Sequence, residues 1–432
     1  MAYDLGILGG GESGFGAALL ARARDMSVFL SEYGALAEDH RMSLKQHDIS
    51  FEEGGHTIDV LSQCKAIVKS PGIPQKASVI QRLRQKGVTI ISEIELASLY
   101  MPEHAKMIAI TGSNGKTTTT NLIHHLLVTA GYHAVKGGNL GPSFSNLLMG
   151  EHADYYVVEV SSFQLEDISS FKPDMALLLN ITPDHLDRYN YDFDEYADTK
   201  MNIKTYQRDR DMFIYNAEDQ AIVKRLVPSD GDTGVGIYYK DRPKEIDNAY
   251  LTGEHNRMNA AFAIRTLQEL GVSDQDIQLG LKTFVNDDHR MQPVADLDGV
   301  NWINDSKATN VDSTRYALMA IPDNIIWIVG GVDKGNDYES LLGLVKERVK
   351  HIIALGTDNS KIEAAFGQIA SVSSVSSMEA AIALAREISQ DGDTVLLSPA
   401  CASFDLFKNY MDRGEQFIAQ VTQLMNTKKL GS

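Results

Sequence analysis

Short runs of apolar residues, each followed by a glycine-rich or polar loop and then a helix-like stretch, recur along the whole chain. Examples are LGILGGGES, KAIVKSPGIP, MIAITGSNGK, YYVVEVSSF, IIWIVGGVDKG and TVLLSPACAS. Continuous apolar runs that alternate with helical patterns are typical of parallel strands covered on both faces by crossover helices. The pattern therefore predicts an α/β fold, in which ligands bind at the carboxyl ends of the strands.

The length of 432 residues predicts several domains, because a typical domain has roughly 150 residues. A polar, proline-containing break at 100–104 and the polar run at 286–289 indicate two boundaries. We therefore expect three domains, over 1–97, 98–286 and 287–432. The fold class that we predict combines a Rossmann-like N-terminal domain, a central P-loop ATPase domain with a mostly parallel sheet, and a Rossmann-like C-terminal domain.

The charge balance and the cysteine content exclude several classes of protein. Acidic residues outnumber basic ones by 58 to 40, a net charge of -18, so nucleic acid and anionic membrane surfaces are unfavourable partners. Two cysteines are too few for a disulfide scaffold or a cysteine-built zinc site. The sequence has no signal-peptide pattern at its start and no long apolar run. We expect a cytoplasmic protein that acts as a monomer on small molecules.

The segment TGSNGKTT, residues 111–118, directly follows a predicted strand at 107–110. Glycines let backbone N–H groups approach phosphate oxygens, Lys116 can neutralise charge, and the Thr117 hydroxyl can bind Mg²⁺. Ile110 stands where the common P-loop has a glycine, so this loop is a shorter variant, TGxxGKT. The segment predicts a nucleoside triphosphate site; the alternative is a chance Gly-Lys-Thr turn.

Two further loops lie in the first predicted domain. Residues 9–14 fit the pattern G-x-G-x-x-G, and Glu32 follows the second predicted strand. This pattern permits a dinucleotide, another nucleotide-like ligand, or tight packing alone. The turn at 70–72, Ser-Pro-Gly, is either a second phosphate-facing turn or an ordinary proline turn.

Three polar residues of the central region are candidates for metal or phosphate binding. Glu159 ends a predicted strand, where a carboxylate can bind Mg²⁺ or simply face solvent. His185 follows the next strand and can bind a metal, orient a phosphate, or be an ordinary surface histidine. Lys200 lies on a helix predicted over 193–206, and its periodicity favours a solvated helix face.

Together these motifs resemble the ATP-dependent Mur ligases, which add amino acids to the growing peptidoglycan peptide. The resemblance extends over essentially the whole chain and rests on TGSNGKTT, EVSSFQL, NITPDHLDRY, YADTK, EHNRMNA, NDSKATN and SPACASFD. The last two strings are similar to the branch that adds D-glutamate to UDP-N-acetylmuramoyl-L-alanine. NDSKATN argues against the folylpolyglutamate ligases, which share the short phosphate loop.

The resemblance implies an amide ligase that works through an acyl phosphate, with a set of site residues for each substrate. It implies ATP contacts at Gly112, Ser113, Asn114, Gly115, Lys116, Thr117, Thr118, Asn256, Asn259, Arg290, Asp305 and Lys307. It implies UDP-substrate contacts at Gly11, Glu12, Ser13, Ser31, Glu32, Ser70, Pro71, Gly72, Asn139 and His185, and D-glutamate contacts at Thr309, Lys334, Ser403 and Tyr410. The implied catalytic residues are Lys116, His185, Lys200 and Arg290. Two Mg²⁺ ions are implied, one at Thr117 and Glu159 and one at His185 and a carbamylated Lys200.

Two functions of other classes stay open at this point. An NAD-dependent oxidoreductase would use the first glycine-rich loop, leave the phosphate loop without a role, and bind NAD tightly. A P-loop binding module or switch would hydrolyse nucleotide without needing any amino acid.

Overall fold

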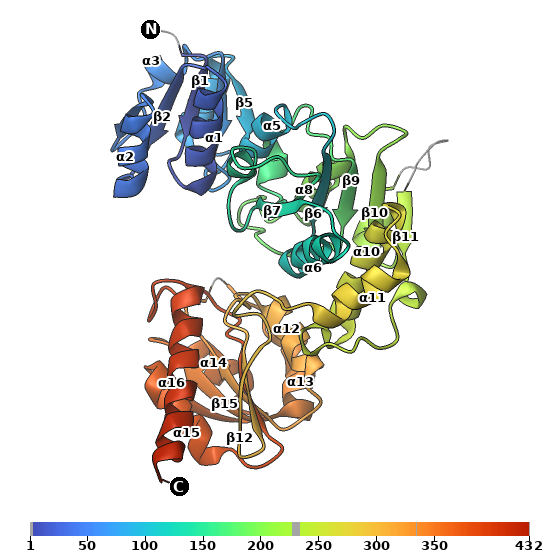
Figure 1. The fold of residues 1–432 in the computed structure, drawn as a ribbon. Coiled ribbons are helices and arrows are strands. Elements are labelled where there is room, and N and C mark those ends of the chain that lie inside the picture. Colours follow the sequence, from blue (N-terminus) through green and yellow to red (C-terminus); the bar gives the residue numbers. More distant parts are fainter. Residues whose placement is uncertain (1–2, 227–233, 334, 432) are drawn as a thin grey trace. The chain divides into compact units, whose positions relative to one another are not determined.

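The computed structural model describes residues 3–226, 234–333 and 335–431, which form three β-sheets with helices between the strands (Figure 1). The described residues divide into two compact units, one within 1–244 and 258–282 and the other within 245–257 and 283–432. The first two sheets belong to the first unit, and the third sheet belongs to the second.

The first sheet has the order β3-β2-β1-β4-β5, and all of its strand pairs are parallel. Its strands are β1 (Leu5–Leu8), β2 (Val28–Glu32), β3 (Ser50–Glu53), β4 (Ala66–Lys69) and β5 (Thr89–Ser92). Its helices are α1 (Glu12–Ala23), α2 (Glu38–Gln46), α3 (Ile58–Leu61), α4 (Ser78–Gln85) and α5 (Glu93–Ser98). Strand β1 lies at the centre of the sheet, between β2 and β4. The loops that follow β1, β2 and β4 are therefore neighbours at the carboxyl ends of the strands.

The second sheet has the order β11-β10-β9-β6-β8-β7 and is also parallel throughout. Its strands are β6 (Lys106–Thr111), β7 (Ala134–Gly138), β8 (Tyr155–Glu159), β9 (Met175–Leu178), β10 (Met212–Asn216) and β11 (Gly234–Ile237). The associated helices are α6 (Lys116–Thr129), α7 (Phe144–Leu147), α8 (Phe193–Met201), α9 (Gln220–Val223), α10 (Glu254–Glu269) and α11 (Asp274–Thr283). Short 3₁₀ turns are η1 (Gln164–Asp167), η2 (Asn202–Lys204), η3 (Tyr239–Asp241) and η4 (Ala249–Leu251).

The third sheet has the order β12-β13-β17-β14-β15-β16, with β12 antiparallel to β13 and the other pairs parallel. Its strands are β12 (Gln292–Leu297), β13 (Val300–Asn304), β14 (Ile325–Val329), β15 (Val349–Leu355), β16 (Ser371–Val375) and β17 (Thr394–Leu397). Its helices are α12 (Val311–Ala320), α13 (Glu339–Arg348), α14 (Ser360–Phe366), α15 (Met378–Ile388) and α16 (Tyr410–Gly431). The long helix α16 packs against α15, β12 and β13.

The central strands confirm the predicted α/β fold. Strands β1, β8 and β14 are buried at every residue, as expected for parallel strands with helices on both faces. The helix predicted over 193–206 is shorter than expected, because α8 ends at Met201 and the chain continues as the 3₁₀ turn η2. Within the described ranges, no helix combines the length and apolar character needed to cross a membrane.

Candidate active site

The phosphate loop lies between β6 and α6, at the centre of the second sheet. Gly112 and Gly115 have φ angles of 154° and 84°, which side chains rarely tolerate. A Cβ at Gly115 would also lie 2.5 Å from Oδ1 of Asn259, so α10 closes on the loop at this point. Asn180, after β9, fixes the loop from the other side, because its Oδ1 accepts a hydrogen bond from the Asn114 backbone at 2.8 Å.

Two lysines meet at the carbonyl oxygen of Gly112. Lys116 Nζ donates to this oxygen and to that of Ser113, at 2.8 Å each. Lys200 Nζ, from the last turn of α8, donates to the same Gly112 oxygen at 3.0 Å. Lys116 therefore places a positive charge beside the loop, as a site for an anionic phosphate requires.

Lys200 is only 2% exposed, so the expectation of a solvated helix face was wrong. The helical repeat places Lys200 on the same side of α8 as Tyr196 and Ala197, which are buried too. Asp192 caps this helix by accepting hydrogen bonds from the backbones of Asp194 and Glu195. Periodicity failed because charged residues on the other side of the helix dominate the pattern.

Burial, together with the nearby Lys116 ammonium, lowers the pKa of Lys200 well below its ordinary value. Asp184 and Glu159 oppose this shift without overcoming it. The neutral amine is the form that reacts with carbon dioxide, so the environment of Lys200 favours carbamylation. A carbamate would convert this cation into an oxygen anion that suits a hard metal ion.

Glu159, at the end of β8, is buried and joins two other polar residues. Its Oε2 accepts a hydrogen bond from the Thr117 hydroxyl at 2.6 Å, and its Oε1 accepts one from Asn139 Nδ2 at 2.9 Å. Oxygen atoms of this kind are the ligands that Mg²⁺ prefers. Among the described residues, no three histidine, cysteine or carboxylate side chains form a metal cluster by themselves. A metal ion here would need oxygen atoms from a nucleotide, from Thr117 or from a carbamate as well.

His185 lies in the loop after β9, with a φ of 52° and a side chain that is 48% exposed. Its Nε2 lies 3.6 Å from Asp184 Oδ2, and its ring lies 5.0 Å from that of Phe163. The charge of Asp184 also acts to raise the pKa of Lys200. The same carboxylate therefore lies near both predicted metal ligands, His185 and Lys200.

The first sheet brings together the loops predicted to bind the UDP substrate. Ser31 and Glu32 end β2, while Ser70, Pro71 and Gly72 follow β4, which lies on the other side of β1. Ser70 Oγ donates to the Gly9 carbonyl at 3.3 Å, so the turns after β1 and β4 touch. Nothing lies within 4 Å of a Cβ built at either Gly11 or Gly72, so both turns are open.

Two carboxylates of this region already have backbone partners. Glu32 accepts hydrogen bonds from the backbones of Gly10 at 2.6 Å and Gly34 at 2.8 Å. Glu12 accepts one from the backbone of Ser143 at 3.1 Å, from the second sheet's α7. Ser31 Oγ donates to Glu52 at 2.6 Å. These partners hold the loops in place, whatever ligand they bind.

In the second unit, Asp305 follows β13 and is buried. Its Oδ2 accepts a hydrogen bond from Ser398 Oγ at 2.9 Å, and its Oδ1 accepts one from the Met291 backbone at 3.2 Å. Burial raises the pKa of Asp305 to about 7. The neighbouring Arg290 is partly buried, and within the described chain its Nε has no hydrogen-bond partner.

Residues predicted to bind ATP and D-glutamate meet in this unit. Lys307 Nζ lies 3.2 Å from the Tyr410 hydroxyl, to which it donates, and 4.9 Å from the centre of the ring. Thr309 donates its backbone N–H to the Lys307 carbonyl, and Ser403 is buried after β17. Lys334 lies outside the described residues. Asn256 lies on α10 with its Nδ2 donating to the Thr252 carbonyl at 3.0 Å.

Sequence reasoning missed three kinds of support for this site. Tyr196 OH lies 2.9 Å from Ser113 Oγ, and Asn180 fixes Asn114. Arg413 is buried and joins two loops by donating to the carbonyls of Ser306 and Cys401. Asn180 belongs to the family-like string NITPDHLDRY, so the sequence could have indicated its role. Nothing in the sequence pairs Arg413 with either loop.

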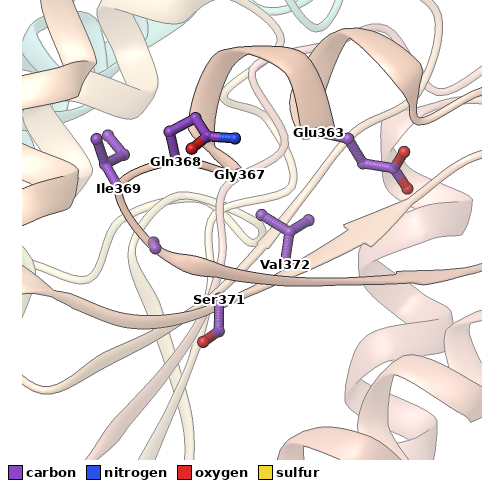
Figure 2. A pocket seen from close by; sticks show the side chains of 7 residues that line it. Glu363, Gly367, Gln368, Ile369, Ser371 and Val372 are labelled. Carbon is purple, nitrogen blue, oxygen red and sulfur yellow. The ribbon is translucent and has the colours of Figure 1, made fainter.

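Two surface pockets lie in the third sheet's region. One, of about 570 Å³, lies where α14 leads into β16, at the amino end of that strand (Figure 2). It has none of the predicted site residues, in keeping with its position away from the carboxyl ends. A second, of about 330 Å³, lies at the carboxyl ends of β14 and β15 and is lined in part by Asp333, Lys361 and Cys401.

Comparisons with known proteins decide the family. Three family profiles match consecutive parts of the chain: the MurD N-terminal domain over 4–79, the Mur ligase middle domain over 110–248, and the glutamate ligase domain of Mur ligases over 289–401. A UDP-N-acetylmuramoylalanine–D-glutamate ligase of Christiangramia forsetii is 43% identical over 98% of this chain and 100% of its own length. The chain belongs to the Mur ligase family.

A second relative supports the family, and a solved structure supports the fold. A Cytophaga hutchinsonii ligase of the same name is 44% identical, again over 98% of this chain and 100% of its own. The crystal structure of a UDP-N-acetylmuramate-alanine ligase from Thermotoga maritima covers 98% of this chain and 99% of its own, with 18% identity and a TM-score of 0.61. That structural likeness supports the three-domain α/β fold. The boundaries near 97 and 286 stay predictions.

Proposed function

We propose that this chain joins D-glutamate to UDP-N-acetylmuramoyl-L-alanine and converts ATP to ADP and phosphate. The observation that carries the proposal is the identity of 43–44% over the full length of relatives with that named activity. The arrangement of the second sheet supports it, because a phosphate loop flanked by Lys116, Thr117 and Glu159 suits ATP.

The reaction has two steps. The L-alanine carboxylate attacks the γ-phosphorus of ATP and releases ADP, which leaves an acyl phosphate. The D-glutamate amine then attacks the acyl carbon, and the tetrahedral intermediate collapses to the amide and phosphate. Lys116 stabilises charge on the transferred phosphoryl group, as in phosphoryl transfer generally.

Metal binding extends the proposal. Thr117 and Glu159 would hold one Mg²⁺, and His185 with a carbamylated Lys200 would hold a second. Bound Mg²⁺ would neutralise developing negative charge on the phosphate oxygens. Asn256, Asn259, Arg290, Asp305 and Lys307 are proposed as further ATP contacts, alongside the loop residues 112–118.

The other substrates are assigned to the two Rossmann-like regions. The UDP substrate is proposed to bind the open turns at 11–13, 31–32 and 70–72, with Asn139 and His185. D-glutamate is proposed to bind Thr309, Lys334, Ser403 and Tyr410. The hydrogen bond from Lys307 to the Tyr410 hydroxyl supports this placement, because it brings a cation next to a residue proposed to bind D-glutamate. A monomer in the cytoplasm is also expected.

ADP release tests the function. The purified chain is incubated with ATP, a panel of UDP-muramoyl acceptors and a panel of amino acids. We expect ADP only when UDP-N-acetylmuramoyl-L-alanine and D-glutamate are both present. ADP release without an amino acid would favour a nucleotide-hydrolysing switch, and tight NAD binding without ATP turnover would favour an oxidoreductase.

A further inference from the structure

Four largely buried charged side chains and the half-exposed Arg84 form an ionic seam between the first and the second sheet. Lys69 and Arg84 come from the first sheet's region, and Glu166, Asp167 and Arg188 come from the second. All five lie in the same compact unit. None belongs to the site residues assigned above.

Lys69 is the centre of the ionic seam. It is the last residue of β4, immediately before the turn at 70–72, and its side chain is 1% exposed. Its Nζ donates hydrogen bonds to Glu166 at 3.0 Å and to the Ile73 carbonyl at 3.2 Å, and it forms an ion pair with Asp167 at 3.0 Å. Two hydrogen bonds and a second ion pair therefore hold the buried ammonium in place.

Arg188 continues the ionic seam toward His185, three residues earlier. Its Nε and one terminal nitrogen hold both oxygens of Glu166, at 3.1 and 2.9 Å. The same terminal nitrogen donates to the Ile73 carbonyl at 3.1 Å. Its guanidinium lies 4.2 Å from the centre of the Phe163 ring, which in turn contacts the ring of His185.

The ionic seam therefore connects two places that the UDP substrate must reach. One end is the turn at 70–72, which is proposed to bind the UDP substrate. The other end is the His185 loop, close to the phosphate loop where the acceptor carboxylate reacts. Arg84 also belongs to the ionic seam, through Asp167 at 2.8 Å, but its side chain is 48% exposed. Asp167 pairs with Lys69, whereas the contacts that reach the His185 loop run from Glu166 through Arg188.

Stability alone does not explain this arrangement. Buried ion pairs are weak evidence for stabilisation, because desolvation offsets much of the attraction. A bidentate arginine–carboxylate pair adds geometric specificity, and the Arg188–Glu166 pair is of this kind. Misplacement of a reacting group by about 1 Å can cost on the order of 10²-fold in rate.

We infer that Lys69, Glu166 and Arg188 are positioning residues that set the distance between the UDP-binding turn and the reacting carboxylate. This inference rests on the proposed function, because it assigns both ends of the substrate. The three residues act through the turn at 70–72 and the His185 loop and do not touch the reacting atoms.

The test compares Arg188→Lys with Arg84→Lys. Both keep the charge and lose the fork of the guanidinium, but only Arg188 lies on the path to His185. We expect Arg188→Lys to lower kcat/KM for the UDP substrate on the order of 10²-fold. Its affinities for UDP alone and for a non-hydrolysable ATP analogue should stay unchanged, as should its melting temperature. Arg84→Lys should behave as the wild type in every measurement.

Three outcomes would overturn the inference: normal kcat/KM in Arg188→Lys, an equal loss in Arg84→Lys, or a parallel loss of UDP and ATP-analogue binding with a lower melting temperature. Failure of the proposed function would look different, because the wild type itself would release no D-glutamate-dependent ADP. Amide hydrogen exchange over 183–190 then decides. Faster exchange in Arg188→Lys than in Arg84→Lys supports the ionic seam as a positioning device, and equal exchange rejects it.

Discussion

Two of the glycine-rich loops, at 9–14 and 112–115, each follow a buried parallel strand and lead into a helix, and their surroundings differ in charge. At 9–14 the nearest charged groups are carboxylates, and Glu32 accepts the Gly10 amide hydrogen bond. At 112–115 they are the Lys116 ammonium and the side-chain nitrogen of Lys200, whose pKa is lowered by burial. This difference shows that the spacing of glycines only allows a ligand to approach the backbone closely. The charges of the neighbouring side chains decide which ligand can bind there.

The glycines of the two loops also have different structural roles. A Cβ at Gly14 would lie 1.9 Å from the Gly9 carbonyl oxygen, so this glycine allows α1 to pack on the loop. Gly115, by contrast, has a φ of 84° and faces Asn259. The first pattern, which resembles a dinucleotide fingerprint, is thus in part a packing motif.

Lys116→Ala should give the largest effect, because it removes the charge that distinguishes the second loop. We expect turnover to fall on the order of 10²–10³-fold, typical of losing one electrostatic contact to the transition state. UDP affinity, measured by calorimetry, should not change. Lys106→Ala, at the exposed start of β6, is the matched control. Near-normal turnover in Lys116→Ala would contradict the assignment of this loop as the ATP phosphate site.

Lys200→Ala sharpens the comparison by removing the second lysine side chain of the loop. We expect a loss of at least about 10-fold, because disturbing even an outer-shell partner of a metal ligand costs about 10–100-fold. A small carboxylic acid should restore part of the activity, because it can occupy the place of the carbamate. Lys204→Ala, one turn later, should need no rescue. Full activity of Lys200→Ala would rule the carbamate out.

Gly14→Ala and Gly11→Ala separate packing from ligand binding in the first loop. The Gly14 methyl group would meet a backbone oxygen, so we expect a loss of about 1–3 kcal/mol in stability. This should lower the melting temperature by about 2–4 °C for each kcal/mol. Gly11→Ala meets nothing within 4 Å and should melt as the wild type. Equal melting of the two variants would contradict the packing role of Gly14.

Glu93, whose pKa is affected by burial and by Glu12 of the first loop, allows the carboxylates of this region to be tested through the pH dependence of stability. Burial raises the pKa of Glu93 to about 7, against 4.5 for an ordinary glutamate. Between these values the folded chain binds more protons than the unfolded chain, so stability falls as pH rises. The slope is at most about 1.4 kcal/mol per pH unit.

Glu93→Gln should flatten this slope, as measured by unfolding from pH 5 to pH 7. Glu95→Gln is the control: burial alone would raise the pKa of Glu95, but hydrogen bonds from Ser170 and Ser169 lower it. Its ionised form therefore stabilises the fold at neutral pH, and the substitution should lower stability there. An unchanged slope in Glu93→Gln would show that Glu93 is ionised when folded.

Much of the fold was predictable because its strands are continuous apolar runs that end in polar loops. Glu159 was placed correctly at a strand end for this reason. Lys200 was not, because whether a helix face is buried depends on what packs against it and not on its own charges. The ionic seam was also out of reach, since Lys69 and Arg188 are far apart in sequence and share the acceptors Glu166 and Ile73 only in the folded chain. The site assignments of both units stay predictions.

Transfer of oxygen from the acceptor tests the central claim most directly. The carboxylate of the L-alanyl group is labelled with ¹⁸O, and the phosphate released with D-glutamate is analysed by mass spectrometry. An acyl phosphate requires one labelled oxygen to leave with the phosphate when the amine attacks the carbonyl carbon. We expect one ¹⁸O atom in each phosphate released, and unlabelled phosphate would contradict the proposed reaction.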